Sequence, residues 1–120
     1  MDCLFCKIIN KKISCYTIYE DDIALAFLDI NPDCNGHILI IPKKHFLDID
    51  DIDNKTFNHI FEISKDIKLL LEEKLNIEGL TFVQNNGDIQ AIKHFHLHLK
   101  PFYKNNVIKP VKEIYDILKR

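Results

Sequence analysis

The chain has 120 residues, a formal net charge of −2 at pH 7, and a hydrophobic content of 47%. A chain of this length suits one domain, so we expect a single domain over residues 1–120 with a packed core. Its slightly acidic balance argues against binding nucleic acid or an anionic membrane through the overall field.

The N-terminus lacks the basic region and apolar stretch that mark a signal peptide. No apolar run approaches the ~18 residues that cross a bilayer. We therefore expect a cytoplasmic protein whose four cysteines are reduced thiols.

The order of the expected elements indicates an α+β fold. In chain order they are a helix at 6–10, strands at 15–20, 23–30 and 37–41, a helix at 53–75, strands at 79–85 and 94–99, and a helix at 110–118. Asp53 is the expected N-cap of the long helix, and Pro101 is expected to end the last strand. Hairpin-length connections predict a mostly antiparallel five-stranded sheet with the long helix packed on it and a short C-terminal helix.

The most informative segment is His94-Phe95-His96-Leu97-His98-Leu99. On a strand, the three histidines share one face and the three apolar residues share the other. A neutral imidazole on a rigid element can attack phosphorus, while a neighbouring ring stabilises the developing charge. The alternatives are an exposed polar face and a metal site, although three histidines in a line converge poorly on one ion.

With its surroundings, this segment resembles the signature of the histidine triad (HIT) family. The similarity covers about residues 3–103. It is carried by Cys3-Leu4-Phe5-Cys6-Lys7-Ile8-Ile9, Tyr19-Glu20-Asp21-Asp22, Ala26-Phe27-Leu28-Asp29-Ile30-Asn31-Pro32, Gly36-His37-Ile38-Leu39-Ile40-Ile41-Pro42-Lys43-Lys44-His45 and Gln90-Ala91-Ile92-Lys93 before the histidines. The resemblance implies a homodimer of α+β protomers that join their sheets and cleave bonds to the α-phosphate of nucleotides.

The resemblance also implies roles for individual residues. His96 would attack the α-phosphorus and form a nucleotidyl-histidine intermediate, with His98 and His37 lining the phosphate pocket together with Asn85 and Gln90. Asp29 would bond the ribose hydroxyls, a role that suits a carboxylate. The expected base pocket consists of Leu4, Phe5, Ile8, Phe27 and Ile30.

Cys3-x-x-Cys6 is half of a zinc site by spacing, and the competing interpretation is a pair of reduced thiols or a redox dithiol. In zinc-bearing members of the family, the remaining ligands correspond to His45 and His94. Two thiolates and two imidazoles would make a closed, structural zinc site. The resemblance implies that the chemistry itself requires no cofactor.

Three departures from the family pattern affect the expected activity. The turn before Gln90 is about two residues shorter than usual, Ile89 stands where glycine is common, and Ala91 stands where a hydroxyl often contacts phosphate. Residues 102–104 also replace a segment that often carries an arginine.

Three functions therefore remain open. The first is hydrolysis of nucleoside phosphoramidates or adenylated amines, and the second is hydrolysis of dinucleoside polyphosphates. The third is a low-turnover, zinc-containing nucleotide-binding protein.

Overall fold

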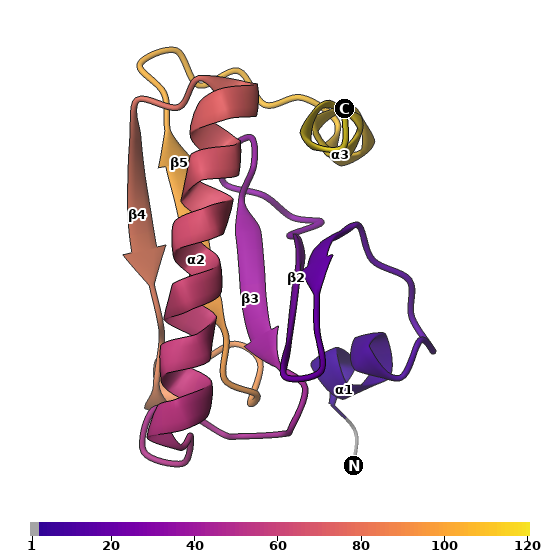
Figure 1. Ribbon diagram of the computed structural model, residues 1–120, viewed down its shortest axis with the longest axis vertical. Helices are drawn as coiled ribbons and strands as arrows, with labels where there is room; N and C mark the ends of the chain where they lie inside the picture. Colours follow the sequence, from indigo (N-terminus) through magenta and orange to yellow (C-terminus); the bar gives the residue numbers. More distant parts are fainter. Residues whose placement is uncertain (1–2) are drawn as a thin grey trace.

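The computed structural model describes residues 3–120, which form a five-stranded sheet and three α-helices (Figure 1). In chain order the elements are α1 (Leu4–Ile9), β1 (Thr17–Glu20), β2 (Ala24–Leu28), β3 (Ile38–Pro42), α2 (Asn54–Leu75), β4 (Gly79–Val83), a 3₁₀ turn η1 (Gly87–Ile89), β5 (Leu97–Phe102) and α3 (Val111–Leu118). The strands lie in the order β1-β2-β3-β5-β4, and every neighbouring pair is antiparallel. The α+β prediction is confirmed.

The helix α2 lies lengthwise against one face of the sheet (Figure 1). Its N-cap is Asp53, whose carboxylate accepts a hydrogen bond from the Thr56 backbone N–H, as the sequence predicts. Buried residues on one stripe of α2 pack against the apolar residues of β3 and β5: Ile60, Ile63, Ile67 and Leu71. Within residues 3–120, no helix has both the length and the apolar character required to cross a bilayer.

A second, smaller core lies on another set of sheet side chains and includes α1. Phe5 and Ile8 of this helix pack with buried residues of β2 and β3, namely Leu25, Phe27, Leu39 and Ile41. The alternation of side chains along β2 and β3 thus serves two cores, which explains why both strands are buried throughout.

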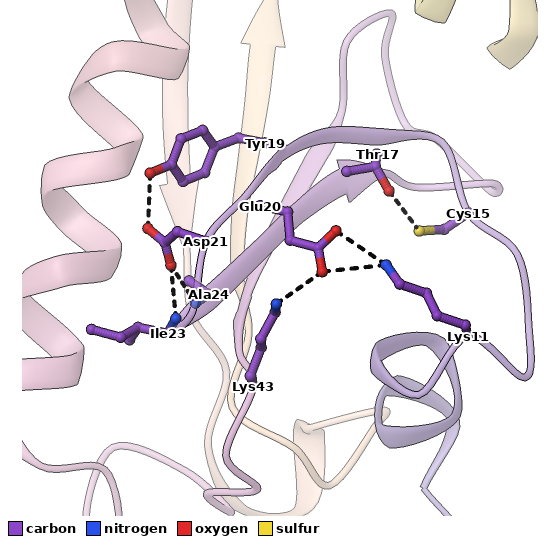
Figure 2. A network of polar contacts seen from close by, with 9 residues as sticks. All are labelled: Lys11, Cys15, Thr17, Tyr19, Glu20, Asp21, Ile23, Ala24 and Lys43. Carbon is purple, nitrogen blue, oxygen red and sulfur yellow. Dashed lines mark hydrogen bonds and ion pairs between the residues drawn. The ribbon is translucent and has the colours of Figure 1, made fainter.

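The turn between β1 and β2 is closed by Asp21 (Figure 2). Its Oδ1 accepts hydrogen bonds from the backbone N–H groups of Ile23 and Ala24, and its Oδ2 accepts one from the Tyr19 hydroxyl. His59 of α2 reaches the same Oδ2 at 2.6 Å. This aspartate therefore connects the turn to the long helix.

Glu20 makes a second set of ion pairs beside this turn (Figure 2). Its carboxylate lies 2.8 Å from Lys43 Nζ, just after β3, and 3.1 Å from Lys11 Nζ, just after α1. Lys11 has a left-handed backbone, with a φ of 63°. Glu20 thus connects the segment that follows α1 to the sheet.

The last strand departs from the prediction at both ends. We expected it at 94–99, but β5 begins at Leu97, because the Phe95 N–H donates to the Phe46 carbonyl oxygen instead of to β3. Pro101 does not end the strand either. The Phe102 carbonyl oxygen faces β4 and accepts a hydrogen bond from the Glu78 N–H. Because neighbouring residues of a strand direct their backbone polar groups to opposite sides, the Pro101 ring nitrogen faces β3. The pairing of β3 with β5 ends at Leu99, so no partner on β3 requires an N–H at Pro101.

Candidate functional site

A pocket of about 250 Å³ lies among α1, the end of β2 and the segment that precedes β5. It brings together residues that are far apart in the sequence. Its lining includes Leu4, Phe5, Ile8, Phe27, Asp29, Ile30, Asn85, His96 and His98, all of which the sequence assigned to the site. The lining combines apolar side chains with two imidazoles and one carboxylate, which suits a ligand with a flat apolar part and a polar part.

His96 is held in one tautomer. Its Nδ1 lies 2.8 Å from the carbonyl oxygen of His94, and because a carbonyl only accepts, this nitrogen carries the proton. The other nitrogen, Nε2, therefore keeps its lone pair. Phe5 packs edge-on against the His96 ring, with the centroids 5.1 Å apart. The structure thus presents a neutral, oriented imidazole with one basic nitrogen.

His98 is fixed by a chain of hydrogen bonds. The Asp33 backbone N–H donates to His37 Nδ1 at 3.2 Å, so the proton of His37 is on Nε2. This Nε2–H donates to His98 Nδ1 at 2.9 Å, which places the His98 proton on its own Nε2. His98 therefore offers the pocket a hydrogen-bond donor, whereas His96 offers it a lone pair.

Burial keeps these imidazoles neutral at pH 7. It lowers the pKa of His98 to about 4, and the neighbouring His96 and His37 rings act in the same direction. Burial also lowers the pKa of His96 and of His37 below the ordinary histidine value. A neutral His96 is the form that can act as a nucleophile.

Asp29 lies just after β2 and lines the pocket. Its Oδ1 accepts a hydrogen bond from the Asn31 N–H, and its Oδ2 lies 3.7 Å from His37 Nε2. The side chain is 20% exposed and therefore only partly buried by these contacts. With His37 and His98 it forms a group of metal-type donors, but the Asp33 N–H disfavours the His37 tautomer that would bind an ion through Nε2.

Two residues assigned to the phosphate pocket lie elsewhere. His37 is only 2% exposed and contacts His98 from behind, outside the pocket lining. Gln90 is 3% exposed, and its Nε2 donates to the Leu47 carbonyl at 2.6 Å. The Gln90 Oε1 is buried and has no hydrogen-bond partner in residues 3–120. These positions suit support of the site more directly than contact with a ligand.

The pocket also contains residues that the sequence did not single out for it. They are Ile13, Ser14, Cys15, Leu28, Asn31, Leu39 and Ile92. Leu39 could have been found from the strand pattern, since it pairs with Phe27 across β2 and β3. The segment 13–15 carries no such signal because it belongs to no helix or strand.

Four metal-type donors meet at one side of this pocket: Cys3, Cys6, His45 and His94. His94 Nδ1 lies 3.4 Å from Cys3 Sγ, 3.6 Å from Cys6 Sγ and 3.2 Å from His45 Nδ1. Cys6 Sγ lies 3.3 Å from His45 Nδ1. Zinc bonds of 2.0–2.3 Å in a tetrahedron separate such donors by about 3.3–3.8 Å, so these four separations are close to those of a zinc site, and all the donor atoms lie within 4.8 Å of one another.

The tautomer of His94 agrees with this arrangement. Its Nε2 lies 2.8 Å from the carbonyl oxygen of Pro42 and therefore carries the proton. The Nδ1 lone pair then faces the thiols. Burial lowers the pKa of His94 to about 4, which keeps the ring in the neutral form that binds metal. The backbone carbonyl that fixes a histidine ligand is a common outer-shell feature of zinc sites.

The fold and the paired imidazoles define a small α+β protein with a histidine-lined pocket, and comparison with known proteins gives its family. The HIT domain matches residues 10–105. The chain belongs to the HIT domain family.

Curated relatives support this assignment. The chain is 42% identical over 107 residues to a HIT-like protein of Methanocaldococcus jannaschii, which covers 87% of this chain and 81% of the relative. It is 36% identical over 103 residues to adenosine 5′-monophosphoramidase of Schizosaccharomyces pombe, which covers 84% of this chain and 74% of the relative.

A solved structure extends the comparison to three dimensions. A Zn-bound histidine triad family protein from Mycobacterium smegmatis superposes with a TM-score of 0.91 at 30% identity. The match covers 99% of this chain and 91% of that one.

Proposed function

We propose that this chain hydrolyses nucleoside phosphoramidates, or closely related adenylated amines, with His96 as the nucleophile. The observation that carries the proposal is the His96 tautomer: the His94 carbonyl binds Nδ1–H and leaves the Nε2 lone pair on a residue that lines the pocket. Relatives named adenosine 5′-monophosphoramidase, at 36–38% identity, favour this substrate class.

In the first step, His96 Nε2 forms a bond to the α-phosphorus and the bond from phosphorus to the leaving nitrogen breaks. The leaving amine departs with the electron pair and takes up a proton from solvent. In the second step, water attacks phosphorus, the bond to His96 breaks, and a proton returns to solvent. The products are the amine and a nucleoside monophosphate.

The other pocket residues assist these steps. His98 Nε2–H is the donor that we assign to the phosphate oxygens, where it would stabilise the charge of the transition state. We assign the ribose hydroxyls to Asp29 and the base to the apolar wall around Phe5 and Phe27, whose rings lie 5.7 Å apart.

We also propose that Cys3, Cys6, His45 and His94 hold one structural zinc ion. The ion would supply no chemistry to the reaction. It would connect the N-terminal segment, and so the α1 wall of the pocket, to the segment that carries His96. The donor separations and the His94 tautomer support this proposal.

A cytoplasmic homodimer is the assembly we propose for this enzyme. The strand β4 is one of the two edges of the sheet, and Phe82 of β4 and Phe102 of β5 expose 40% and 56% of their surface. An edge strand flanked by exposed aromatic side chains suits pairing with a second copy.

One observation favours a second function, namely nucleotide binding with little turnover. Ala91 occupies a pocket position without the hydroxyl that would donate to phosphate. The loss of one such donor costs about 1 kcal/mol or more in the transition state.

Steady-state assays with adenosine phosphoramidate distinguish the two functions. Hydrolysis by the wild-type chain and its loss in His96→Ala support the enzyme. Tight binding without detectable release of the amine contradicts it.

A further inference from the structure

Lys100 continues the line of imidazoles along β5, although it lies outside the pocket lining. It follows His98 by two residues on the same strand, so the two side chains leave the sheet on the same face. Its Nζ lies 2.8 Å from Asp33 Oδ2, and the Lys100 side chain is 31% exposed. The ion pair joins β5 to the loop between β2 and β3.

Asp33 makes one interaction through its carboxylate and another through its backbone N–H. Its carboxylate binds Lys100, and this ion pair holds the pKa of Asp33 below its ordinary value. Its backbone N–H donates to His37 Nδ1 at 3.2 Å. The position of Lys100 thus bears on the position of the backbone N–H that donates to His37 Nδ1.

Three hydrogen bonds connect Lys100 to His98. Lys100 donates to the Asp33 carboxylate, the Asp33 N–H donates to His37, and His37 Nε2–H donates to His98 Nδ1. His98 and Lys100 are themselves two residues apart on β5, so four residues are linked in a ring. His98 is the only one of the four that lines the pocket. Its Nε2 carries a proton only while His37 keeps the tautomer that the Asp33 N–H selects.

We propose that Lys100 is a positioning residue for the reaction, and that its ion pair with Asp33 fixes the tautomers of His37 and His98. The inference rests on the proposed function for its effect on rate, but its structural part concerns the ligand-free protein. Lys100 touches no substrate. It acts on the phosphate through Asp33, His37 and finally the Nε2–H of His98.

The loop that carries Asp33 is also held by contacts that do not involve Lys100. Asn35 also anchors the loop. Its side-chain Nδ2 donates to the Val107 carbonyl at 2.8 Å, and its backbone carbonyl oxygen accepts from the Tyr103 hydroxyl at 2.7 Å. The loop therefore keeps its fold when the ion pair is removed. Loss of Lys100 should move the Asp33 N–H without unfolding the segment.

The test uses the full chain and the variants Lys100→Met, Lys100→Arg and Asp33→Ala. Long-range ¹H–¹⁵N spectra of the ligand-free protein report which nitrogen of each imidazole is protonated. The wild type should show His37 and His98 with bare Nδ1 and protonated Nε2. Lys100→Met and Asp33→Ala should both convert part of this population to the other tautomer, whereas Lys100→Arg should retain the wild-type pattern.

The same variants are then assayed with adenosine phosphoramidate. Lys100→Met should lower kcat by about fivefold with little change in KM, because an exposed ion pair contributes about that factor. The double variant Lys100→Met/Asp33→Ala should be no slower than either single variant. Lys68→Met, which removes a comparable ion pair with Glu72 on α2, is the matched control and should change neither the spectra nor kcat.

Unchanged imidazole spectra in Lys100→Met and Asp33→Ala overturn the inference, whatever the activity. Altered spectra together with a wild type that hydrolyses no phosphoramidate leave the imidazole positioning in place and remove the proposed function. The two failures are therefore distinguishable.

Discussion

The carbonyl oxygen of His94 lies 2.8 Å from Nδ1 of His96. The same His94 turns its own Nδ1 toward Cys3, Cys6 and His45. One residue thus contributes its ring to the donor cluster and its backbone to the orientation of the proposed nucleophile. The arrangement of the donor cluster and the orientation of the His96 ring are therefore linked.

Removal of the His96 imidazole should abolish turnover and leave the fold intact. His96→Ala is expected to lower kcat by at least about 1000-fold, because His98, the other imidazole of the described pocket lining, has its Nδ1 lone pair engaged by His37. Steady-state assays and thermal unfolding measure the two effects. His59→Ala, on α2 and outside the pocket, is the control and should keep its activity; similar activity in both variants would contradict the mechanism.

We predict about one zinc ion per chain in freshly purified protein. Cys6→Ser should lose the metal and lower the free energy of unfolding by about 3 kcal/mol or more, since metal binding is coupled to folding. Metal analysis and denaturant unfolding check both values. Cys34→Ser changes a buried thiol outside the cluster and should retain the zinc; metal-free wild-type protein would remove the site from the account.

Asp29→Asn should raise KM for a ribonucleotide substrate by about 10-fold or more, because hydrogen bonds to a charged group contribute about 1.5–3 kcal/mol. Asparagine retains the oxygen that accepts from the Asn31 N–H, so the turn survives. A substrate that lacks both ribose hydroxyls supplies the control. It should bind the wild type and the variant almost equally, and an equal rise in KM for both substrates would argue against a ribose contact.

The acidic limb of activity should lie below pH 6.5, because burial lowers the pKa of the proposed nucleophile His96 as well as that of His98. Burial lowers the pKa of His98 to about 4, so its neutral, donating form persists as the pH falls through the ordinary histidine range. A ¹⁵N titration of His98 alongside kcat/KM measures this. The lowered pKa of His98 also affects stability. The unfolded chain binds a proton at His98 at a higher pH than the folded chain does, so protonation of His98 favours unfolding as the pH falls below 6.5. A His98 midpoint near 6.5 would contradict the assignment.

Asp21 should confer stability that disappears only in strong acid. Burial alone would raise its pKa, but hydrogen bonds from His59, Ile23, Ala24 and Tyr19 outweigh burial and lower it to about 2. The contribution is therefore complete above about pH 5 and is lost as the pH falls from about 4 toward 2.

The variant Asp21→Asn tests this contribution. It should lower the free energy of unfolding by about 2 kcal/mol at pH 7, and by progressively less below pH 4. Denaturant unfolding across this range measures the difference. A deficit that stays constant down to pH 2 would contradict the role of the charge.

Sequence reasoning identified the fold and the elements whose signals are local. The Asp53 cap and the apolar stripe of α2 are examples, since both depend on residues a few positions apart. The start of β5 was not predictable in this way. It depends on the hydrogen bond from the Phe95 N–H to the Phe46 carbonyl, which joins segments about 50 residues apart.

In the candidate site, too, contacts between distant parts of the chain were not predictable from local sequence. The Cys-x-x-Cys spacing indicated half of the donor cluster, but His45 and His94 entered only through the family resemblance. The chain of bonds from Lys100 through Asp33 to His37 has no sequence signature, because a loop and a strand from distant parts of the chain create it. The placement of Gln90 against the Leu47 carbonyl was likewise visible only in three dimensions.

The covalent intermediate is the central claim, and mass spectrometry tests it most directly. Protein mixed with adenosine phosphoramidate and quenched with acid-free denaturant should carry one nucleotidyl group, on the peptide that contains residue 96. His98→Ala should accumulate more of it if water attack is slowed, and His96→Ala should carry none. Turnover in the wild type with no labelled protein at any quench time, or a label on another residue, would contradict the account.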